Sequence, residues 1–189
     1  MRKALFNESA KTVTLKFMEN NDVPRFIAAH DLVTTKQAAA LLFSLPGIPM
    51  LYNGQEVGCK LHPYSGRAVF DRDRTIASAD TLQLMGYYKK LLKLRAAYPA
   101  LWTAGIEEVP LPGSKSLIAF ERRKTDELFV IMLNLSNTDE SADINLNGYN
   151  CAVDVLMDKE FKCNDQSGLA VNIPVYAHGI RWLLLKKKA

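Results

Sequence analysis

The stretch FMENNDVPRF, residues 17–26, places four polar residues directly after an apolar segment. Apolar residues between positions 13 and 18 predict a buried β-strand. That strand runs into Glu19, Asn20, Asn21 and Asp22, and hydrophobic residues resume a few positions later. A change from apolar to polar at the lip of a buried strand makes these four residues candidates for a functional site.

Strand-like and helix-like segments alternate from this stretch to about residue 103. Residues 34–45 predict a helix with Thr34 as its N-cap, and Pro46-Gly47 ends it. Its apolar face is expected to hold Ala38, Leu41, Leu42 and Leu45. Residues 48–54 predict a short buried strand.

A loop of about 25 residues follows this strand and is long enough to be functional. After it, a second helix is expected, with Ser78 or Asp80 as its N-cap and Pro99 at its end. Its apolar face is expected to hold Leu84, Tyr87, Tyr88, Leu91, Leu92 and Leu94. This order is typical of a parallel α/β architecture.

The chain changes character near residue 104, where short strand candidates begin to follow one another. They occupy residues 116–123, 127–136, 142–147, 151–158, 169–176 and 179–186. Leu169, Val171, Ile173 and Val175 alternate with polar or small residues, so one face of that strand should be buried. Asn147-Gly148 predicts a hairpin. We therefore expect an antiparallel β-sandwich and two domains, residues 1–103 and 104–189.

Composition excludes several classes of protein. The 189 residues are 48% apolar and 23% charged with a net charge of +4, which is ordinary for a globular chain. No basic stripe interleaves with aromatics and no run approaches about 20 apolar residues, so neither a nucleic acid nor a membrane is an expected partner. The scattered Cys59, Cys151 and Cys163 form no disulfide framework and favour a reducing, cytoplasmic location. Cys59 and His62 are only half of a zinc site, so no metal is expected.

Three segments in this order resemble the C-terminal portion of the α-amylase family, glycoside hydrolase family 13. FMENNDVPRF is similar to that family's fourth motif, a Phe-x-x-Asn-His-Asp pattern at the end of barrel strand seven. LLFSLPGIPMLYNGQEVG (41–58) is similar to helix seven and strand eight, and YYKKLLKLRAAYPAL (87–101) to helix eight. The resemblance implies an α/β part that forms the last two β/α units of a (β/α)8 barrel. An all-β part, the C-terminal antiparallel Greek-key β-sandwich, would follow.

The resemblance also implies roles for four residues. Active sites of such barrels lie at the C-terminal ends of the strands. Asp22 matches the third carboxylate of the family, which binds and distorts the sugar and stabilises the transition state. Asn21 stands where the family has His, and it keeps a hydrogen-bond donor and acceptor for a sugar hydroxyl. Arg25 and Tyr52 are further candidates for substrate binding, although Arg25 and Asn20 also suit structural roles.

Neither the nucleophile nor the acid/base of a retaining glycosidase is found in the sequence. The strand-four and strand-five motifs that carry them in the family are missing. We therefore expect a fragment of an enzyme that acts on α-glucans or related α-glucosides, inactive as this chain. The expected ligand is an α-glucan or oligosaccharide. A quarter of a barrel also exposes sheet edges and apolar surface, so we expect a protein partner as well: either the missing N-terminal barrel portion or a second copy of the chain. No cofactor is expected within the chain, while the resemblance allows calcium in a longer parent.

Two other functions are compatible with parts of the sequence. A non-catalytic carbohydrate-binding or stabilising module would use the β-sandwich, with Trp102, Tyr176 and Trp182 stacking on sugars if exposed and packing the core if not. A nucleotide-binding α/β protein would need a Gly-rich phosphate loop, which is missing. The Glu56 carboxylate and the charge cluster Asp71, Arg72, Asp73 and Arg74 are expected to be structural or solvated rather than catalytic.

Overall fold

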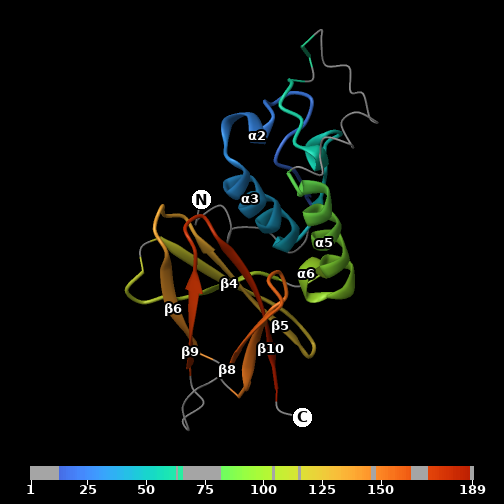
Figure 1. The fold of residues 1–189 in the computed structure, drawn as a ribbon. Coiled ribbons are helices and arrows are strands. Elements are labelled where there is room, and N and C mark those ends of the chain that lie inside the picture. The colour runs from blue at the N-terminus through green and yellow to red at the C-terminus, as the bar shows by residue number, and fades with distance from the viewer. Residues whose placement is uncertain are drawn as a thin grey trace.

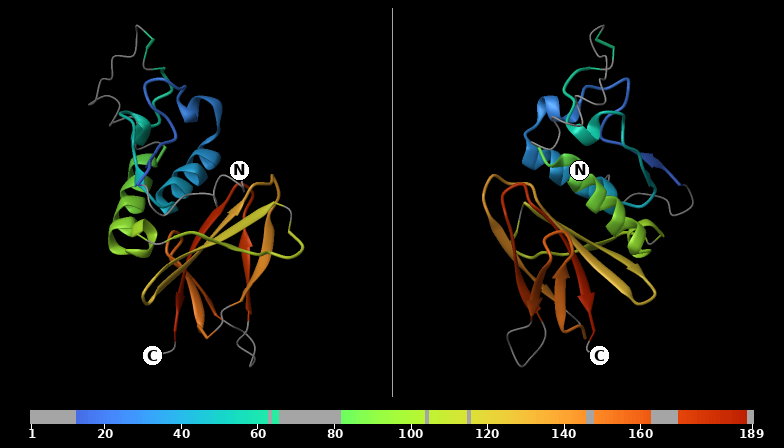
Figure 2. Two further views of the ribbon diagram at one scale, coloured as in Figure 1. Left: turned by 180° about the vertical axis from the view of Figure 1, so that it is seen from behind. Right: turned by 45° about the vertical axis from the view of Figure 1, so that its right-hand side comes forward.

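The structure is a computed structural model that describes residues 13–62, 64–65, 82–103, 105–114, 116–145, 148–162 and 170–187. Helices gather on one side of the β-sheets in all three views (Figures 1 and 2). Expectations for Ser78, Asp80, Asn147, Cys163, Leu169 and the charge cluster at 71–74 lie outside the described residues. Within them, no helix is both long enough and apolar enough to cross a membrane.

The first part of the chain is built on a short parallel strand pair. Strand β1 (Leu15–Lys16) pairs in parallel with β2 (Ile48–Pro49), and Leu15 lies opposite Ile48. Helices α2 (Phe26–Ala29) and α3 (Leu32–Ser44) connect the two strands. Gly47, the residue before β2, has a φ of +93°, and a Cβ there would lie 2.4 Å from the carbonyl oxygen of Thr14. The Pro46-Gly47 turn therefore needs glycine so that β2 can approach β1.

The expected burial of the strand at 13–18 is wrong. Val13 is 78% exposed, Leu15 57% and Phe17 44%. Of its residues, only Leu15 and Lys16 are assigned to the strand. The apolar pattern is that of a buried strand, but the described part of the chain supplies a neighbour on one side only, which is β2.

The N-cap of helix α3 lies three residues before the expected one, Thr34. Asp31 is the N-cap, and its carboxylate accepts a 2.7 Å hydrogen bond from the backbone N–H of Thr34. This backbone hydrogen bond, together with a hydrogen bond from the Thr34 side chain, lowers the pKa of Asp31. The helix buries Ala39, Ala40, Leu42 and Phe43, while three of the four expected core residues, Ala38, Leu41 and Leu45, are only partly buried.

The second expected helix is present as α5 (Leu84–Ala97), followed by the short helix α6 (Ala100–Thr103) after Pro99. Leu84, Tyr88 and Leu91 are buried as expected, but Leu92 is 48% exposed. A 3-10 helix, η1 (Gln55–Val57), lies against α5. The buried Arg95 closes the turn after α3: its guanidinium donates to the carbonyl oxygens of Phe43, Leu45, Gly47 and Leu101 at 2.6–2.9 Å.

The second part of the chain consists of two antiparallel sheets. The larger has the strand order β3-β4-β5-β10-β7-β8, and the smaller pairs β6 with β9. Their bounds are β3 Glu107–Val109, β4 Leu117–Lys124, β5 Glu127–Asn134, β6 Glu140–Asn145, β7 Cys151–Asp154, β8 Lys159–Lys162, β9 Ala170–Val175 and β10 Ile180–Lys186. The sequence missed β3 and β8. β6 and β7, the strands on either side of Asn147-Gly148, belong to different sheets.

Two apolar clusters cover opposite faces of the six-stranded sheet. One lies between the two sheets and includes Met132, Leu183 and the expected alternating residues Val171, Ile173 and Val175. The other joins Phe129, Ile131 and Trp182 of the sheet to Ala39 and Phe43 of α3 and to Leu84 and Tyr88 of α5. An α/β part followed by an all-β part is thus confirmed, and the second cluster crosses the expected domain boundary at 103/104.

Candidate functional site

The candidate site lies where the loops that follow β1 and β2 meet. Because the two strands are parallel, their C-terminal ends lie at the same edge. Residues 17–25 and 50–62 leave that edge at the end of the molecule remote from the β-sheets (Figure 1). Arg25 of the first loop contacts the second through hydrogen bonds to the carbonyl oxygens of Asn53 and Leu61 and through the ring of Tyr52. The four residues that the sequence singled out fall into two contacting pairs, Asn21 with Asp22 and Arg25 with Tyr52.

A buried ion pair fixes the base of the site. Glu19 is 1% exposed and Arg25 6% exposed, and the Arg25 Nη1 atom lies 2.9 Å from Glu19 Oε1. Nη1 also donates to the carbonyl oxygen of Asn53 at 2.8 Å, and Nε donates to that of Leu61 at 3.1 Å. Glu19 Oε2 accepts the backbone N–H of Phe26 at 2.7 Å. Arg25 therefore ties the loop after β1 to the loop after β2, and a direct contact of Arg25 with substrate stays a prediction.

Asn20 shapes the turn that presents the next two residues. Its Oδ1 atom accepts the backbone N–H groups of Asp22 at 2.8 Å and Val23 at 3.0 Å. This Asx-type turn replaces the backbone pairing that the strand no longer supplies. The expected structural role of Asn20 is confirmed, and the turn leaves the Asn21 and Asp22 side chains exposed.

Asn21, Asp22 and Tyr64 form a hydrogen-bonded triangle at the surface. The Asn21 Nδ2 atom donates to Asp22 Oδ1 at 2.9 Å and to the Tyr64 hydroxyl oxygen at 2.8 Å. The Tyr64 hydroxyl in turn donates to Asp22 Oδ1 at 3.3 Å. Tyr64 lies 42 residues beyond Asp22 in the chain. The sequence marked this loop only as long enough to be functional and did not single out Tyr64, since only the fold shows that the two loops meet.

Tyr52 lies beside the ion pair rather than in the triangle. Its half-buried ring has the Arg25 guanidinium carbon 4.8 Å from the ring centroid, a cation–π contact. Behind it, the buried Gln55 donates to the Tyr88 hydroxyl at 2.8 Å, and burial raises the pKa of Tyr88 to about 12. Glu56 accepts the backbone N–H of Gly54 at 3.0 Å. Gln55 and Glu56 thus brace the loop, and Tyr52 packs against Arg25.

The chemistry available in this arrangement is that of binding and electrostatic stabilisation. Asp22 is the exposed carboxylate of the triangle, while Glu19 is committed to Arg25 and Phe26. Two carboxyl groups about 5 Å apart are needed for retaining glycoside hydrolysis, and the triangle supplies one. Throughout the described ranges, no group of three or more His, Cys, Asp or Glu side chains is placed to hold a metal ion.

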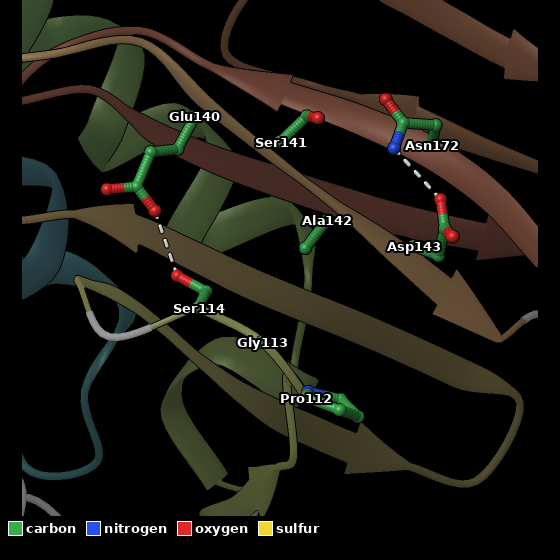
Figure 3. Close-up of a pocket in the computed structure, with 8 residues that line it drawn as sticks. All are labelled: Pro112, Gly113, Ser114, Glu140, Ser141, Ala142, Asp143 and Asn172. Atoms are coloured by element: carbon green, nitrogen blue, oxygen red, sulfur yellow. Dashed lines mark hydrogen bonds between the residues drawn. The ribbon is translucent and has the colours of Figure 1, made fainter.

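A polar pocket of about 260 Å³ lies in the all-β part (Figure 3). Glu140 accepts hydrogen bonds from the hydroxyls of Ser114 and Ser116, which lower its pKa. Asn172 of β9 donates at 2.9 Å to Asp143, which lies on the same strand, β6, as Glu140. No aromatic side chain is among the described residues that line this pocket.

The three aromatic residues considered for a carbohydrate-binding module do not act together. Trp182 is fully buried in the cluster between the sheet and the helices. Trp102 is 46% exposed on α6, with Lys124 over its ring, whereas Tyr176 is 58% exposed and follows β9, with Arg181 over its ring. Packing of the core is thus confirmed for Trp182, and the other two rings remain accessible on separate elements.

Comparison with known proteins places this chain next to α-amylases. It is 29% identical over 146 residues to α-amylase 2 of Dictyoglomus thermophilum, a match that covers 71% of this chain and 24% of that protein. It superposes on the α-amylase of Geobacillus thermoleovorans complexed with acarbose with a TM-score of 0.76, at 21% identity over 94% of this chain and 40% of that one. It superposes on AmyP in complex with maltotriose with a TM-score of 0.72, at 17% identity over 93% of this chain and 41% of that one.

The matches cover only part of each relative. The chain spans 18–24% of the length of the curated relatives that it matches. No protein-family profile matches the chain. The resemblance to the C-terminal portion of an α-amylase-family glycosidase is confirmed.

Proposed function

We propose that this chain is the C-terminal part of a retaining α-glycosidase of the α-amylase family, which acts on α-glucans or related α-glucosides. In this proposal β1, α3, β2 and α5 are the last two β/α units of a (β/α)8 barrel, and the two antiparallel sheets are its Greek-key C-terminal domain. The observation that carries the proposal is the exposed carboxylate of Asp22. It lies at the C-terminal end of a parallel strand, as active-site residues of such barrels do.

Asp22 has a defined role in this proposal. Its carboxylate accepts hydrogen bonds from two hydroxyls of the bound sugar. Its negative charge favours the oxocarbenium-like transition state over the neutral ground state, which is how an electrostatic group lowers a barrier. Asn21 contributes its amide to the same sugar. Unlike the His that the family has at this position, an amide cannot transfer a proton or become positively charged. The substrate therefore differs from that of the enzymes with His, or turnover is lower. Calcium, if the parent binds it, is held outside this chain.

The apolar surface beside β1 supports a completing partner. A groove of about 520 Å³ is lined by Leu15, Phe17 and Met18 on one side and by Phe26, Leu41 and Leu45 on the other. Ile48 of β2 is also 55% exposed. Since the chain covers only about 40% of the solved structures on which it superposes, we assign this groove to the preceding β/α units of the barrel. In their absence, a second copy of the chain covers it.

The experiment that tests the function combines turnover with binding. The purified chain is assayed with an aryl α-maltoside and titrated with acarbose while backbone amide signals are followed by NMR. We expect no turnover and shifts centred on Asn21 and Asp22, which Asp22→Asn weakens. The matched control is Asp143→Asn in the pocket of the all-β part, and it should bind acarbose like the original chain.

Three results would contradict the proposal. Measurable turnover by the pure chain would show that Asp22 is not acting as an isolated third carboxylate. Acarbose binding that Asp143→Asn abolishes and Asp22→Asn leaves intact would move the site to the β-sheets and favour the carbohydrate-binding module. No acarbose binding at all would leave Asp22 without the proposed ligand class.

A further inference from the structure

Tyr64 joins the candidate site from a loop that the motifs did not assign. Its hydroxyl accepts from Asn21 Nδ2 at 2.8 Å and lies 3.3 Å from Asp22 Oδ1. The local chain is held by His62, whose Nδ1 accepts the backbone N–H of Tyr64 at 3.2 Å and whose carbonyl accepts that of Ser65 at 2.9 Å. The tyrosine is therefore fixed at both its backbone and its hydroxyl.

The ring itself remains open to solvent. Tyr64 is 69% exposed although its hydroxyl is hydrogen-bonded. The nearby aromatic contact is a tilted one with His62, whose ring centroid lies 5.9 Å away. An exposed ring anchored through its polar tip presents an apolar face beside polar groups. Binding sites use the same combination when an apolar surface carries a few fixed hydrogen-bonding groups.

Among the described residues, the hydrogen bonds to the Asp22 carboxylate fall on one oxygen. Oδ1 accepts from Asn21 Nδ2 and from the Tyr64 hydroxyl, and within the described residues Oδ2 is left for a ligand. Two donors on one oxygen hold the carboxylate plane in place, because rotation would break both bonds. Tyr64 thus helps to position the carboxylate through its hydroxyl.

We propose that Tyr64 is a substrate-binding and positioning residue: its hydroxyl orients Asp22, and its ring face packs against one pyranose of an α-glucan. The inference rests on the proposed function, since it takes the same ligand class. A pyranose offers an apolar face of C–H groups and a rim of hydroxyls. The exposed ring contacts the face, and Asp22 Oδ2 accepts from a hydroxyl of the rim.

Maltotriose is the probe for the experiment, and its binding to the chain is followed by NMR. Tyr64→Phe keeps the ring and loses the hydroxyl, and Tyr64→Ala loses both. We expect Tyr64→Phe to weaken binding roughly fivefold, the equivalent of one hydrogen bond, and Tyr64→Ala at least about tenfold, since ring packing is lost as well. Tyr176→Ala, which removes an exposed tyrosine remote from the site, is the control and should bind like the original chain.

A second signal tests the positioning role without any ligand. The side-chain amide resonance of Asn21 should move in Tyr64→Phe and stay in place in Tyr176→Ala, because only the first variant removes an Asn21 partner. If Tyr64→Ala binds maltotriose like the original chain while Asp22→Asn binds less, the inference is wrong and the proposed function stands. If the original chain does not bind maltotriose, both are wrong.

Discussion

Arg25→Met is expected to destabilise the chain strongly, because it leaves a buried carboxylate without its cation. Glu19 and Arg25 are 1% and 6% exposed, and their contact is 2.9 Å long. Removing one partner of a buried ion pair costs about 3–5 kcal/mol, most of it from the charge left behind. Arg25 also donates to the carbonyl oxygens of Asn53 and Leu61, so the loss should fall at the upper end of that range.

The double variant Glu19→Met/Arg25→Met separates the charge effect from the packing effect. Replacing both ions with apolar side chains removes the stranded charge, so the free energy of unfolding should recover part of the loss. Urea unfolding followed by circular dichroism gives the four free energies of this cycle. Arg123→Met is the control, since Arg123 is 54% exposed and its 3.1 Å pair with Glu121 should contribute about 0–1 kcal/mol at most.

Amide exchange shows where the change is felt. The backbone N–H of Phe26, which donates to Glu19, should exchange faster in Arg25→Met, because the loop after β1 loosens with the pair. A loss below about 1 kcal/mol, or a cycle in which the two single losses simply add, would refute the view that Arg25 holds the two loops together.

Three further predictions follow from other parts of the structure. Burial raises the pKa of Tyr88 from 10.0 to about 12. The folded state therefore keeps the phenol proton to a higher pH than the unfolded state does. The free energy of unfolding should fall as pH rises from 10 to 12, and the whole contribution of Tyr88 to that fall is about 3 kcal/mol. Tyr88→Phe should flatten that fall in alkaline unfolding curves, and an unchanged slope would contradict the assignment. Arg95→Met should lower stability by at least about 3 kcal/mol in thermal or urea unfolding, because four backbone carbonyls lose their charged donor; a loss under about 1 kcal/mol would be inconsistent with the contacts. Phe17→Ser should reduce self-association in sedimentation, whereas Leu92→Ser, an equally exposed position on α5, should not; equal effects would show that the groove beside β1 is not the contact surface.

The sequence predicted the positions of most strands in the all-β part because each carries its own local pattern. Val171, Ile173 and Val175 alternate with outward residues and are buried in the structure. The strands that it missed, β3 and β8, are short and rich in charge, so no apolar alternation marks them. The order of the strands along the chain did not predict which strands pair, because β6 pairs with β9 rather than with the next strand, β7.

Helix faces were predicted less well for a physical reason. The side of α3 that carries the leucines Leu41 and Leu45 looks like the core face in sequence, but it borders the open groove beside β1. The side carrying Ala39 and Ala40 is fully buried, since small side chains let the helix approach its neighbours closely. The pattern could not show which apolar side would find a neighbour within this chain.

The candidate site was predictable only in part. The Phe-x-x-Asn-x-Asp spacing singled out Asp22 and Asn21 because a short motif lies on one loop. Tyr64 and the Glu19–Arg25 pair depend on contact between two loops or on burial, and neither can be read from spacing. Arg95 was likewise unexpected, since an arginine on a helix is normally solvated, and this one is buried by carbonyls that the fold supplies.

The central claim is that this chain continues a barrel whose earlier strands carry the nucleophile and the acid/base. Reading the DNA upstream of the Met1 codon tests it most directly, over about 300 codons, since a full barrel needs about 250 residues. We predict an in-frame continuation that encodes the strand-four Asp motif and the strand-five Glu. An in-frame stop codon just before Met1 would contradict the claim and remove the support for a catalytic role of Asp22.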